Sequence, residues 1–484
     1  MSEERASYRQ IMKATSIFGG VQVFNIIIAL IRSKAIAILL GPTGIGVAGL
    51  LTSTTGMISS LTNFGLGTSA VKDIASAHSS ENDAQLAKTT TVFKKLVWLT
   101  GILGTVLTIV FSPLLSELTF GNKNYTWSFV LIAITVLLGQ LTNGQNVILQ
   151  GTRNLKFLAT ANMVGSLLSL IITLPLYYFL GMDGIVPALV IMGFVTFLVA
   201  QYFGNKLKIR KILLTKSEVV KEGNSMLKLG FVLSLSGIIT SIVAYVVRIY
   251  ISNTGGLDDV GFYSAGFQII GTYVGLVFTA MGTDFFPKLS AIALDENKVN
   301  SLVNQQSEIT ILVLGPILLF FILLINWVII LLYSENFLEI DDMMRWSALG
   351  MFFKAASWPL GFIFLAKGAT GTFFKSELFF NFYFLVFNIL GYKFFGLAGL
   401  GIAFLISYIL VYIQVYLISY FKYKFIHGKI FFKLFLSQFC LAMFGFIIIQ
   451  QPLGFINTLI MVIIVFTSII ISAFGLYRRY STIN

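Results

Sequence analysis

The chain has 484 residues, of which 57% are hydrophobic and only 11% are charged, and its mean hydropathy is +0.88. A soluble domain carries about 25% charged residues, so this composition excludes an ordinary soluble protein and indicates a membrane protein. The net charge of +13 would suit a nucleic-acid-binding protein. Most lysines and arginines, however, lie in short segments between apolar runs, as at the cytoplasmic face of a membrane, so no nucleic-acid partner is predicted.

Chemistry that depends on clustered cysteines or histidines is also excluded. The single cysteine, Cys440, lies in an apolar run, and the two histidines, His78 and His427, lie far apart in polar loops. This spacing allows neither an internal disulfide nor a metal cluster. A G-x-G-x-x-G match at residues 44–49 follows no strand and opens an apolar run, which favours close helix packing over nucleotide binding. We therefore expect no metal, no cofactor and no enzymatic activity.

The hydropathy pattern predicts an all-α polytopic membrane protein. About 20 apolar residues cross a bilayer as a helix, the form that satisfies every backbone hydrogen bond in lipid. Fourteen such spans are expected, near residues 12–40, 44–70, 92–116, 126–149, 155–180, 184–204, 227–252, 260–284, 307–333, 343–366, 377–395, 398–420, 430–450 and 453–476. Basic and acidic residues alternate between successive connections, which predicts that both termini are cytoplasmic.

An internal repeat relates the two halves of the chain. Residues 11–49 and 226–266 each contain a lysine, an apolar run of roughly 20 residues, an arginine, a turn and a glycine that opens the next run. The matched positions are Lys13 and Lys228, Arg32 and Arg248, Gly46 and Gly261, Gly151 and Gly368, and the segments 181–184 and 396–399.

This repeat predicts two pseudo-symmetric lobes of six helices each, with a substrate site between them. The expected domains are an N-terminal lobe (residues 1–205), a cytoplasmic linker (206–226), a C-terminal lobe (227–421), and an additional two-helix hairpin with a basic C-terminus (422–484). The linker mixes lysines with Ile209, Ile212 and Leu213, a pattern that favours an anionic membrane surface.

Four cations inside the predicted spans are the candidate substrate-binding residues: Arg32, Lys34, Arg248 and Lys354. A charge at the bilayer centre costs about 2.5–3.5 kcal/mol, so each needs a reason to be there. Lys354 should lie about 16 Å deep. Of the four cations, it is therefore the least able to extend its charge to the membrane surface. Together the cations favour an anionic, phosphate-bearing substrate in a wet central cavity.

The surroundings of these cations leave alternatives open. Arg32 shares a helical face with Gln22 and Asn25, a polar stripe that suits a water-filled space. Lys34 points to nearly the opposite side of an ideal helix, so the sequence leaves open which of the two faces the cavity. Arg248 could instead reach lipid headgroups. Asp284 could pair with Lys354 or couple transport to an ion.

Three segments carry a family resemblance: residues 34–46, Arg248 followed by residues 258–261, and residues 285–290. They resemble polysaccharide translocases of the multidrug/oligosaccharidyl-lipid/polysaccharide exporter superfamily, especially O-antigen translocases and the lipid III flippase of the enterobacterial common antigen pathway. The resemblance implies a flippase that moves an undecaprenyl-diphosphate-linked oligosaccharide from the cytoplasmic to the periplasmic leaflet of a bacterial inner membrane by alternating access. Lys34 and Arg248 match family positions, so the resemblance implies that both contact the lumen.

The resemblance also implies partners: the lipid-linked substrate, membrane lipids, and a glycan polymerase with a chain-length regulator of lipopolysaccharide synthesis. The C-terminal hairpin departs from a twelve-span pattern, and either a lipid groove or a partner-binding role would suit it. Two other functions are considered. A drug or metabolite exporter of the same superfamily would favour intramembrane acids, and a membrane glycan polymerase or glycosyltransferase would need a large external loop. Glycan identity, the coupling ion and the oligomeric state are left open.

Overall fold

The computed structural model describes residues 2–80, 82–210, 212–452 and 454–483. The side chains of residues 2–19, 216, 273, 283 and 480–483 are outside this description, so Lys13, the first matched lysine of the repeat, is not among the described side chains. All regular structure of the described residues is helical.

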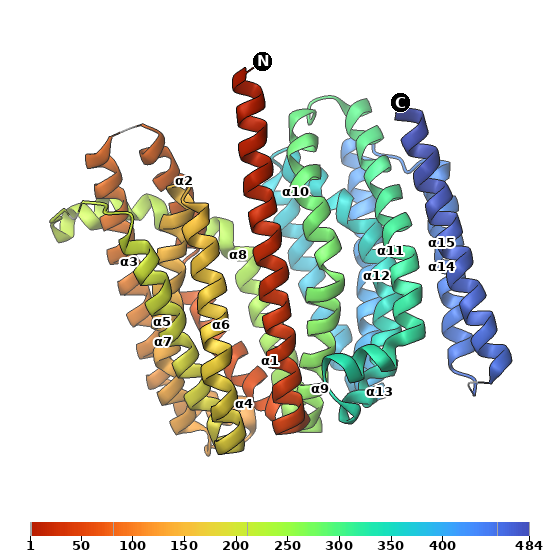
Figure 1. Ribbon diagram of the computed structural model, residues 1–484, viewed down its shortest axis with the longest axis horizontal. Helices are drawn as coiled ribbons and strands as arrows, with labels where there is room; N and C mark the ends of the chain where they lie inside the picture. Colours follow the sequence, from red (N-terminus) through yellow and green to blue (C-terminus); the bar gives the residue numbers. More distant parts are fainter. Residues whose placement is uncertain (1, 81, 211, 453, 484) are drawn as a thin grey trace. The chain divides into compact units, whose positions relative to one another are not determined.

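The helices of the chain (Figure 1) are α1 (Ser2–Thr62), α2 (Leu66–Ser79), α3 (Asp83–Val110), α4 (Ser112–Phe120), α5 (Thr126–Gly151), α6 (Leu155–Leu180), α7 (Ile185–Asn205), α8 (Lys216–Gly255), α9 (Leu257–Gln268), α10 (Leu276–Ala291), α11 (Glu296–Leu332), α12 (Asp341–Ala366), α13 (Thr370–Tyr423), α14 (Lys429–Ile449) and α15 (Phe455–Ile483). Three short segments join neighbours: η1 (Gly181–Gly184), η2 (Ile269–Val274) and η3 (Glu335–Ile340).

Within the described residues, 11 helical stretches are long and apolar enough to cross a membrane. Three of them turn at a glycine and so provide two spans each, which gives the fourteen expected. α1 leaves helical geometry at Gly41 (φ 65°), just before Pro42, and α13 does so at Gly396 (φ 56°). Gly181 (φ 57°) separates α6 from α7. Only glycine adopts such positive φ angles without strain, so these turns follow from the sequence. The predicted fold class is confirmed.

The second and third predicted spans differ from single helices. The second is interrupted between α1 and α2, where Phe64 (φ 46°) and Gly65 (φ 62°) are left-handed and the Asn63 side chain accepts a hydrogen bond from the Gly65 amide at 2.7 Å. Gly230 of α8 approaches this break so closely that a Cβ there would lie 2.5 Å from the Phe64 carbonyl oxygen. The third span ends at Val110, and α4 begins at Ser112 with Pro113 in its first turn, a position that tolerates proline.

Positive φ angles recur along the chain at a constant offset of 215 residues. Gly41 and Gly256 both have positive φ, as do Gly181 and Gly396. The counterpart of Gly368 is Arg153, not Gly151 as the sequence pattern suggested, because both Gly368 and Arg153 are left-handed. The amides of Arg153 and Gly368 each bond the carbonyl three residues earlier at 3.0 Å.

Gly46 and Gly261, which open the second span of each repeat, lie where two backbone segments approach each other closely. A Cβ on Gly46 would lie 2.0 Å from the carbonyl oxygen of Leu257, and a Cβ on Gly261 would lie 2.0 Å from that of Pro42. The two contacts are reciprocal, since Pro42 and Leu257 are also 215 residues apart. The Thr43 hydroxyl donates to the Asp258 carboxylate beside them. Backbone proximity therefore explains why glycine is needed at both positions.

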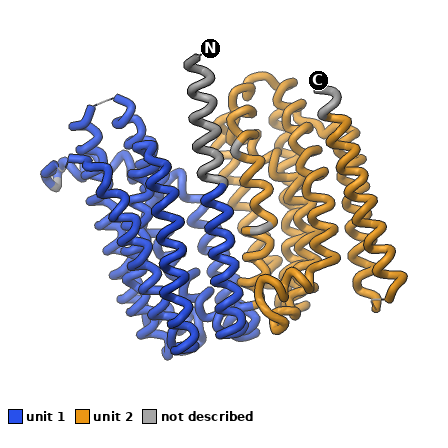
Figure 2. Tube along the Cα trace, in the orientation of Figure 1, with its two compact units in different colours: residues 1–261 blue, residues 262–484 orange. Residues whose placement is uncertain are grey.

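The contacts divide the chain into two units, residues 1–261 and 262–484 (Figure 2). The predicted linker lies inside the first unit, where Leu207, Ile209 and Leu214 pack against a core that includes Phe93 and Leu96. α8 also belongs to this unit. The predicted division into two six-helix lobes and a hairpin stays a prediction.

In the second unit, the hairpin of α14 and α15 packs against α11 through polar contacts. The Arg479 guanidinium bonds the Glu308 carboxylate at 2.5 and 3.0 Å. Gln438 donates to the Ser472 hydroxyl at 3.0 Å and accepts a hydrogen bond from that of Ser468 at 2.6 Å. Gly315 of α11 leaves space for Gln438, because a Cβ there would lie 2.8 Å from the amide oxygen. The hairpin is thus an integrated part of its unit.

Candidate functional site

Lys354 lies at the middle of α12, a helix of 26 residues. Its ammonium is 5.5 Å from the centroid of the Phe278 ring and 5.4 Å from that of Tyr408. Both distances suit a cation–π interaction, which contributes about 0.5–2 kcal/mol. None of the ion pairs found among the described residues involves Lys354. The charge is therefore held by ring faces inside the helical bundle of the second unit.

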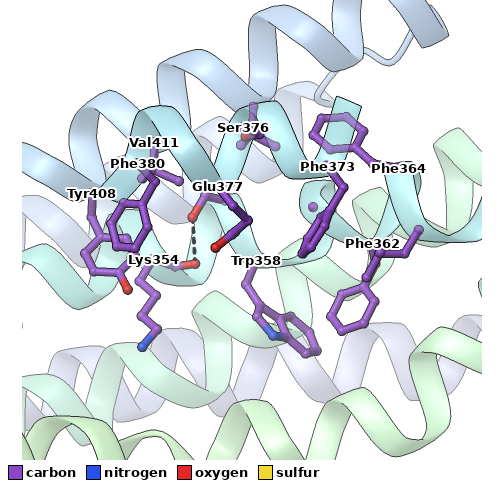
Figure 3. Close-up of a pocket in the computed structure, with 14 residues that line it drawn as sticks. Lys354, Trp358, Phe362, Phe364, Phe373, Ser376, Glu377, Phe380, Tyr408 and Val411 are labelled. Atoms are coloured by element: carbon purple, nitrogen blue, oxygen red, sulfur yellow. Dashed lines mark hydrogen bonds between the residues drawn. The ribbon is translucent and has the colours of Figure 1, made fainter. Parts of the chain in front are cut away.

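A pocket of about 350 Å³ opens beside Lys354, between α12 and the two halves of α13. Figure 3 shows Lys354, Glu377 and Tyr408 at one end of this pocket and Trp358, Phe362 and Phe373 at the other. One end thus offers an amine, a carboxylate and a hydroxyl, and the other offers aromatic faces. Such a combination suits a ligand with both charged and ring-shaped parts.

Glu377 is the functional candidate that the sequence analysis missed. The eleventh span was expected to begin at residue 377, which would leave this carboxylate at the membrane surface. α13 begins at Thr370 instead, so Glu377 lies two turns inside the helix and lines the pocket. The apolar pair Phe373 and Phe374 before it is the local signal that could have shown this.

A polar network supports the same region from the second half of α13. Gln414 donates to the Ser376 hydroxyl at 2.8 Å, and the Tyr383 hydroxyl donates to the Gln414 amide oxygen at 3.1 Å. Ser376 lines the pocket next to Glu377. These bonds join the two halves of α13, which meet at Gly396, and so fix the side of the pocket that carries the carboxylate.

Arg32 of α1 contacts α6 and α7 within the first unit. Its Nη1 donates to the sulfur of Met192 at 3.2 Å, and Tyr177 lies near enough to interact with it electrostatically. Its buried Nε has no hydrogen-bond partner among the described residues. A guanidinium carries five N–H donors. Arg32 therefore keeps donors that these contacts do not use.

The other predicted site residues of the first unit vary in exposure. Gln22 is exposed, and Asn25 and Lys34 are half-buried. The side-chain oxygen of Asn25 is buried and has no partner among the described residues. Arg248 of α8 is half-buried, and its Nη1 donates to the Ala244 carbonyl at 3.1 Å.

Asp284 of α10 is exposed and forms an ion pair with Lys288, one turn along, at 2.6 Å. The structure thus gives Asp284 a partner on its own helix. Arg345, in the first turns of α12, is nearly buried and pairs with Asp341 and Asp342 at 2.9 and 3.2 Å. Both charges are therefore matched locally.

Of the seven predicted site residues, Lys354 and Asp284 lie in the second unit, and the others lie in the first. A single cavity that gathers all four cations stays a prediction. In the part of the chain that the structure describes, no group of three or more metal-ligating side chains lies together.

Fourteen spans with an internal repeat, and charges held within them, define a multi-pass membrane protein of the transporter class. The chain belongs to the family described as polysaccharide biosynthesis protein, whose model matches residues 35–342.

Two curated relatives have names that describe transport. The chain is 26% identical over 325 residues to a candidate O-antigen transporter of Shigella flexneri, covering 65% of this chain and 75% of that protein. It is 21% identical over 359 residues to the lipid III flippase of Escherichia coli (strain K12), covering 72% and 83%.

Among solved structures, the chain resembles the lipid II flippase MurJ in an inward closed conformation, with a TM-score of 0.73 and 15% identity, over 97% of this chain and 99% of that one. At this identity the likeness shows the fold. So little of the chain is unmatched that the C-terminal hairpin must belong to the shared fold. The departure of the hairpin from a twelve-span family pattern stays a prediction.

Proposed function

We propose that this protein is a flippase for lipid-linked oligosaccharide diphosphates, which carries the repeat unit of a surface glycan from the cytoplasmic to the periplasmic leaflet of a bacterial inner membrane by alternating access. The family, the two named relatives and the fold support this function. The observation that carries it is Lys354, an ammonium at mid-helix whose near neighbours are aromatic rings.

The ammonium of Lys354 is suited to a diphosphate. The two cation–π contacts, at about 0.5–2 kcal/mol each, offset much of the cost of a charge at mid-membrane, which is about 2.5–3.5 kcal/mol. A phosphate oxygen would add a charge-assisted hydrogen bond, which is about twice as strong as a neutral one. Arg32, Lys34 and Arg248 are the corresponding phosphate ligands proposed for the first unit.

The rest of the pocket is suited to sugars. Glu377, Ser376 and Tyr408 offer hydrogen-bonding groups for hydroxyls, while Trp358 and Phe362 offer faces on which a sugar ring can stack. A drug or metabolite exporter would favour intramembrane acids. Glu377 is such an acid, but it shares its pocket with the Lys354 ammonium, which favours the flippase. The protein moves its substrate without covalent chemistry, and both termini lie in the cytoplasm. A glycan polymerase and a chain-length regulator act on the product.

Export of surface glycan tests this function. Lys354→Ala should lower export about tenfold or more at equal protein abundance, since a hydrogen bond to a charged group contributes about 1.5–3 kcal/mol. Lys354→Arg should retain part of the export, and Arg32→Ala and Lys34→Ala should each lower it. The measurements are surface glycan by immunoblot and flipping of a fluorescent undecaprenyl-diphosphate oligosaccharide in proteoliposomes.

Lys298→Ala is the matched control, because this exposed lysine of the same unit pairs with Asp295 at 3.2 Å outside the pocket. It should export normally. Wild-type flipping by all three alanine variants would reject the cationic site. Drug efflux by the wild-type protein without glycan flipping would support the exporter alternative.

A further inference from the structure

A second, separate groove lies in the first unit, between α3, the connecting segment after α7 and the start of α8. It has a volume of about 840 Å³. Its lining includes Lys94, Trp98 and Leu99 of α3, Arg210 and Ile212 of the connecting segment, and Val220 of α8. None of these residues belongs to the proposed substrate site.

The end of the connecting segment, at Leu214 and Thr215, and the start of α8 are held in place by polar contacts. The Lys95 ammonium donates to the Leu214 carbonyl at 2.8 Å. The Thr215 and Glu218 side chains cap the start of α8 reciprocally, and Lys88 of α3 pairs with Glu222 of α8 at 2.9 Å. The groove is therefore a built feature of the fold.

The groove combines an apolar floor with a positive rim. The side chains of Trp98, Leu99 and Val220 are 48%, 61% and 69% exposed. Trp98 and Leu99 lie on α3, which is apolar enough to cross a membrane. The described lining contains the cations Lys94, Lys95 and Arg210 and no carboxylate. Glu218, the nearest acid along the chain, is occupied as the helix cap.

These properties match one kind of ligand. Tryptophan is enriched where lipid headgroups meet acyl chains, and basic residues at that level attract anionic headgroups. A soluble protein partner would need an interface that stays outside the membrane, whereas this floor continues into a predicted span.

We propose that the groove binds an anionic phospholipid, with its phosphate between Lys94 and Arg210 and its acyl chains along Trp98, Leu99 and Val220. The site rests on geometry within one unit, so it stands whether or not the substrate site is as proposed. It gives the connecting segment a function: the lipid ties this segment and the start of α8 to α3.

Quenching of Trp98 fluorescence tests this site directly. The purified full chain in nanodiscs of phosphatidylcholine is titrated with phosphatidylglycerol brominated in its acyl chains, and in parallel with brominated phosphatidylcholine. The part of the quenching that Trp98→Phe removes reports the groove. We expect half-maximal quenching at a much lower fraction of phosphatidylglycerol than of phosphatidylcholine, and a preference that weakens with salt.

Lys94→Gln/Arg210→Gln should reduce this preference about twenty-fivefold, because each cation near the surface contributes a factor of about five. Lys72→Gln/Lys156→Gln removes the same charge from exposed lysines outside the groove and should keep the preference. Equal quenching by the two lipids in the wild-type protein, an equal loss in both double variants, or no Trp98 quenching by either lipid would overturn the proposal. A thermal melt of each variant verifies that it is folded.

Discussion

At the scale of single residues, burial decides the chemistry of a side chain that the sequence placed in a loop. His427 lies between α13 and α14 and is only 4% exposed. Its ring stacks on Phe431 at 3.8 Å and on Tyr416 at 5.3 Å, and its Nδ1 is 3.4 Å from the Asn304 side-chain oxygen. Burial lowers the pKa of His427 to about 3, so the ring is neutral and structural near pH 7.

This pKa predicts how stability depends on pH. Above pH 6.5 His427 is neutral in both states, and as the pH falls the unfolded chain binds the proton first. The protein should therefore lose stability between pH 6.5 and about pH 3, by up to about 2 kcal/mol at pH 5. Thermal melts in detergent at pH 8 and pH 5 measure this loss.

His427→Phe should make that difference in melting temperature smaller. The exposed His78 provides a matched control, and His78→Gln should leave the difference unchanged. An undiminished loss of stability in His427→Phe would show that other groups cause it.

At the scale of elements, the hairpin of α14 and α15 depends on polar partners inside its packing surface. Glu308 is 9% exposed, so the Arg479–Glu308 pair is largely withdrawn from water. Removing one partner of such a pair leaves an uncompensated charge. Glu308 lies at the start of the ninth predicted span and Arg479 in the basic C-terminus, positions that did not reveal this contact.

Glu308→Ala and Arg479→Ala should each destabilise the protein by about 3 kcal/mol. The double variant should be little worse than either single variant, because the two residues act as a pair. Equilibrium unfolding in mixed detergent micelles measures the cycle. Lys433→Ala, on the exposed face of α14, should have a negligible effect. Additive losses in the double variant would mean that the pair does not couple.

At the scale of the whole molecule, the repeat explains where glycines are indispensable. Gly46 and Gly261 occupy equivalent positions, and each faces a carbonyl oxygen of the other copy's first turn. A methyl group at either position must push backbone away from backbone. By contrast, Gly56 of α1 has no atom within 4 Å of a built Cβ and lies in regular helix.

Gly46→Ala and Gly261→Ala should therefore each lower the free energy of unfolding by about 1–3 kcal/mol. Gly56→Ala should be neutral or stabilising by up to about 1 kcal/mol, since alanine favours helix. The same unfolding assay compares all three variants. Normal stability of Gly46→Ala would contradict the reciprocal backbone contact.

Much of the fold could be predicted from the sequence because its signals are local. A window of 20 apolar residues is a span wherever it lies, and a glycine that must adopt a positive φ marks a turn, as at Gly41 and Gly396. The repeat follows from the same two signals. The exceptions are also local in cause, since the second span breaks where Asn63 and Gly65 form their own hydrogen bond.

Less of the candidate site could be predicted. The sequence identified Lys354 as a charge too deep to reach the surface, but Glu377 joined it only because α13 starts earlier than expected. The sequence could not say that Arg32 reaches Met192 or that Gly261 meets Pro42, since these partners lie more than 150 residues apart.

The sequence by itself thus determined the number of spans, the repeat and the charged residues that lie inside the predicted spans. The tertiary structure alone decided which charges are matched between helices, as Glu308 is by Arg479, and which face a pocket, as Lys354 does. The physical reason is that hydrophobicity and backbone preference belong to single residues and short windows. A charge partner, in contrast, is chosen by packing between helices that are distant along the chain.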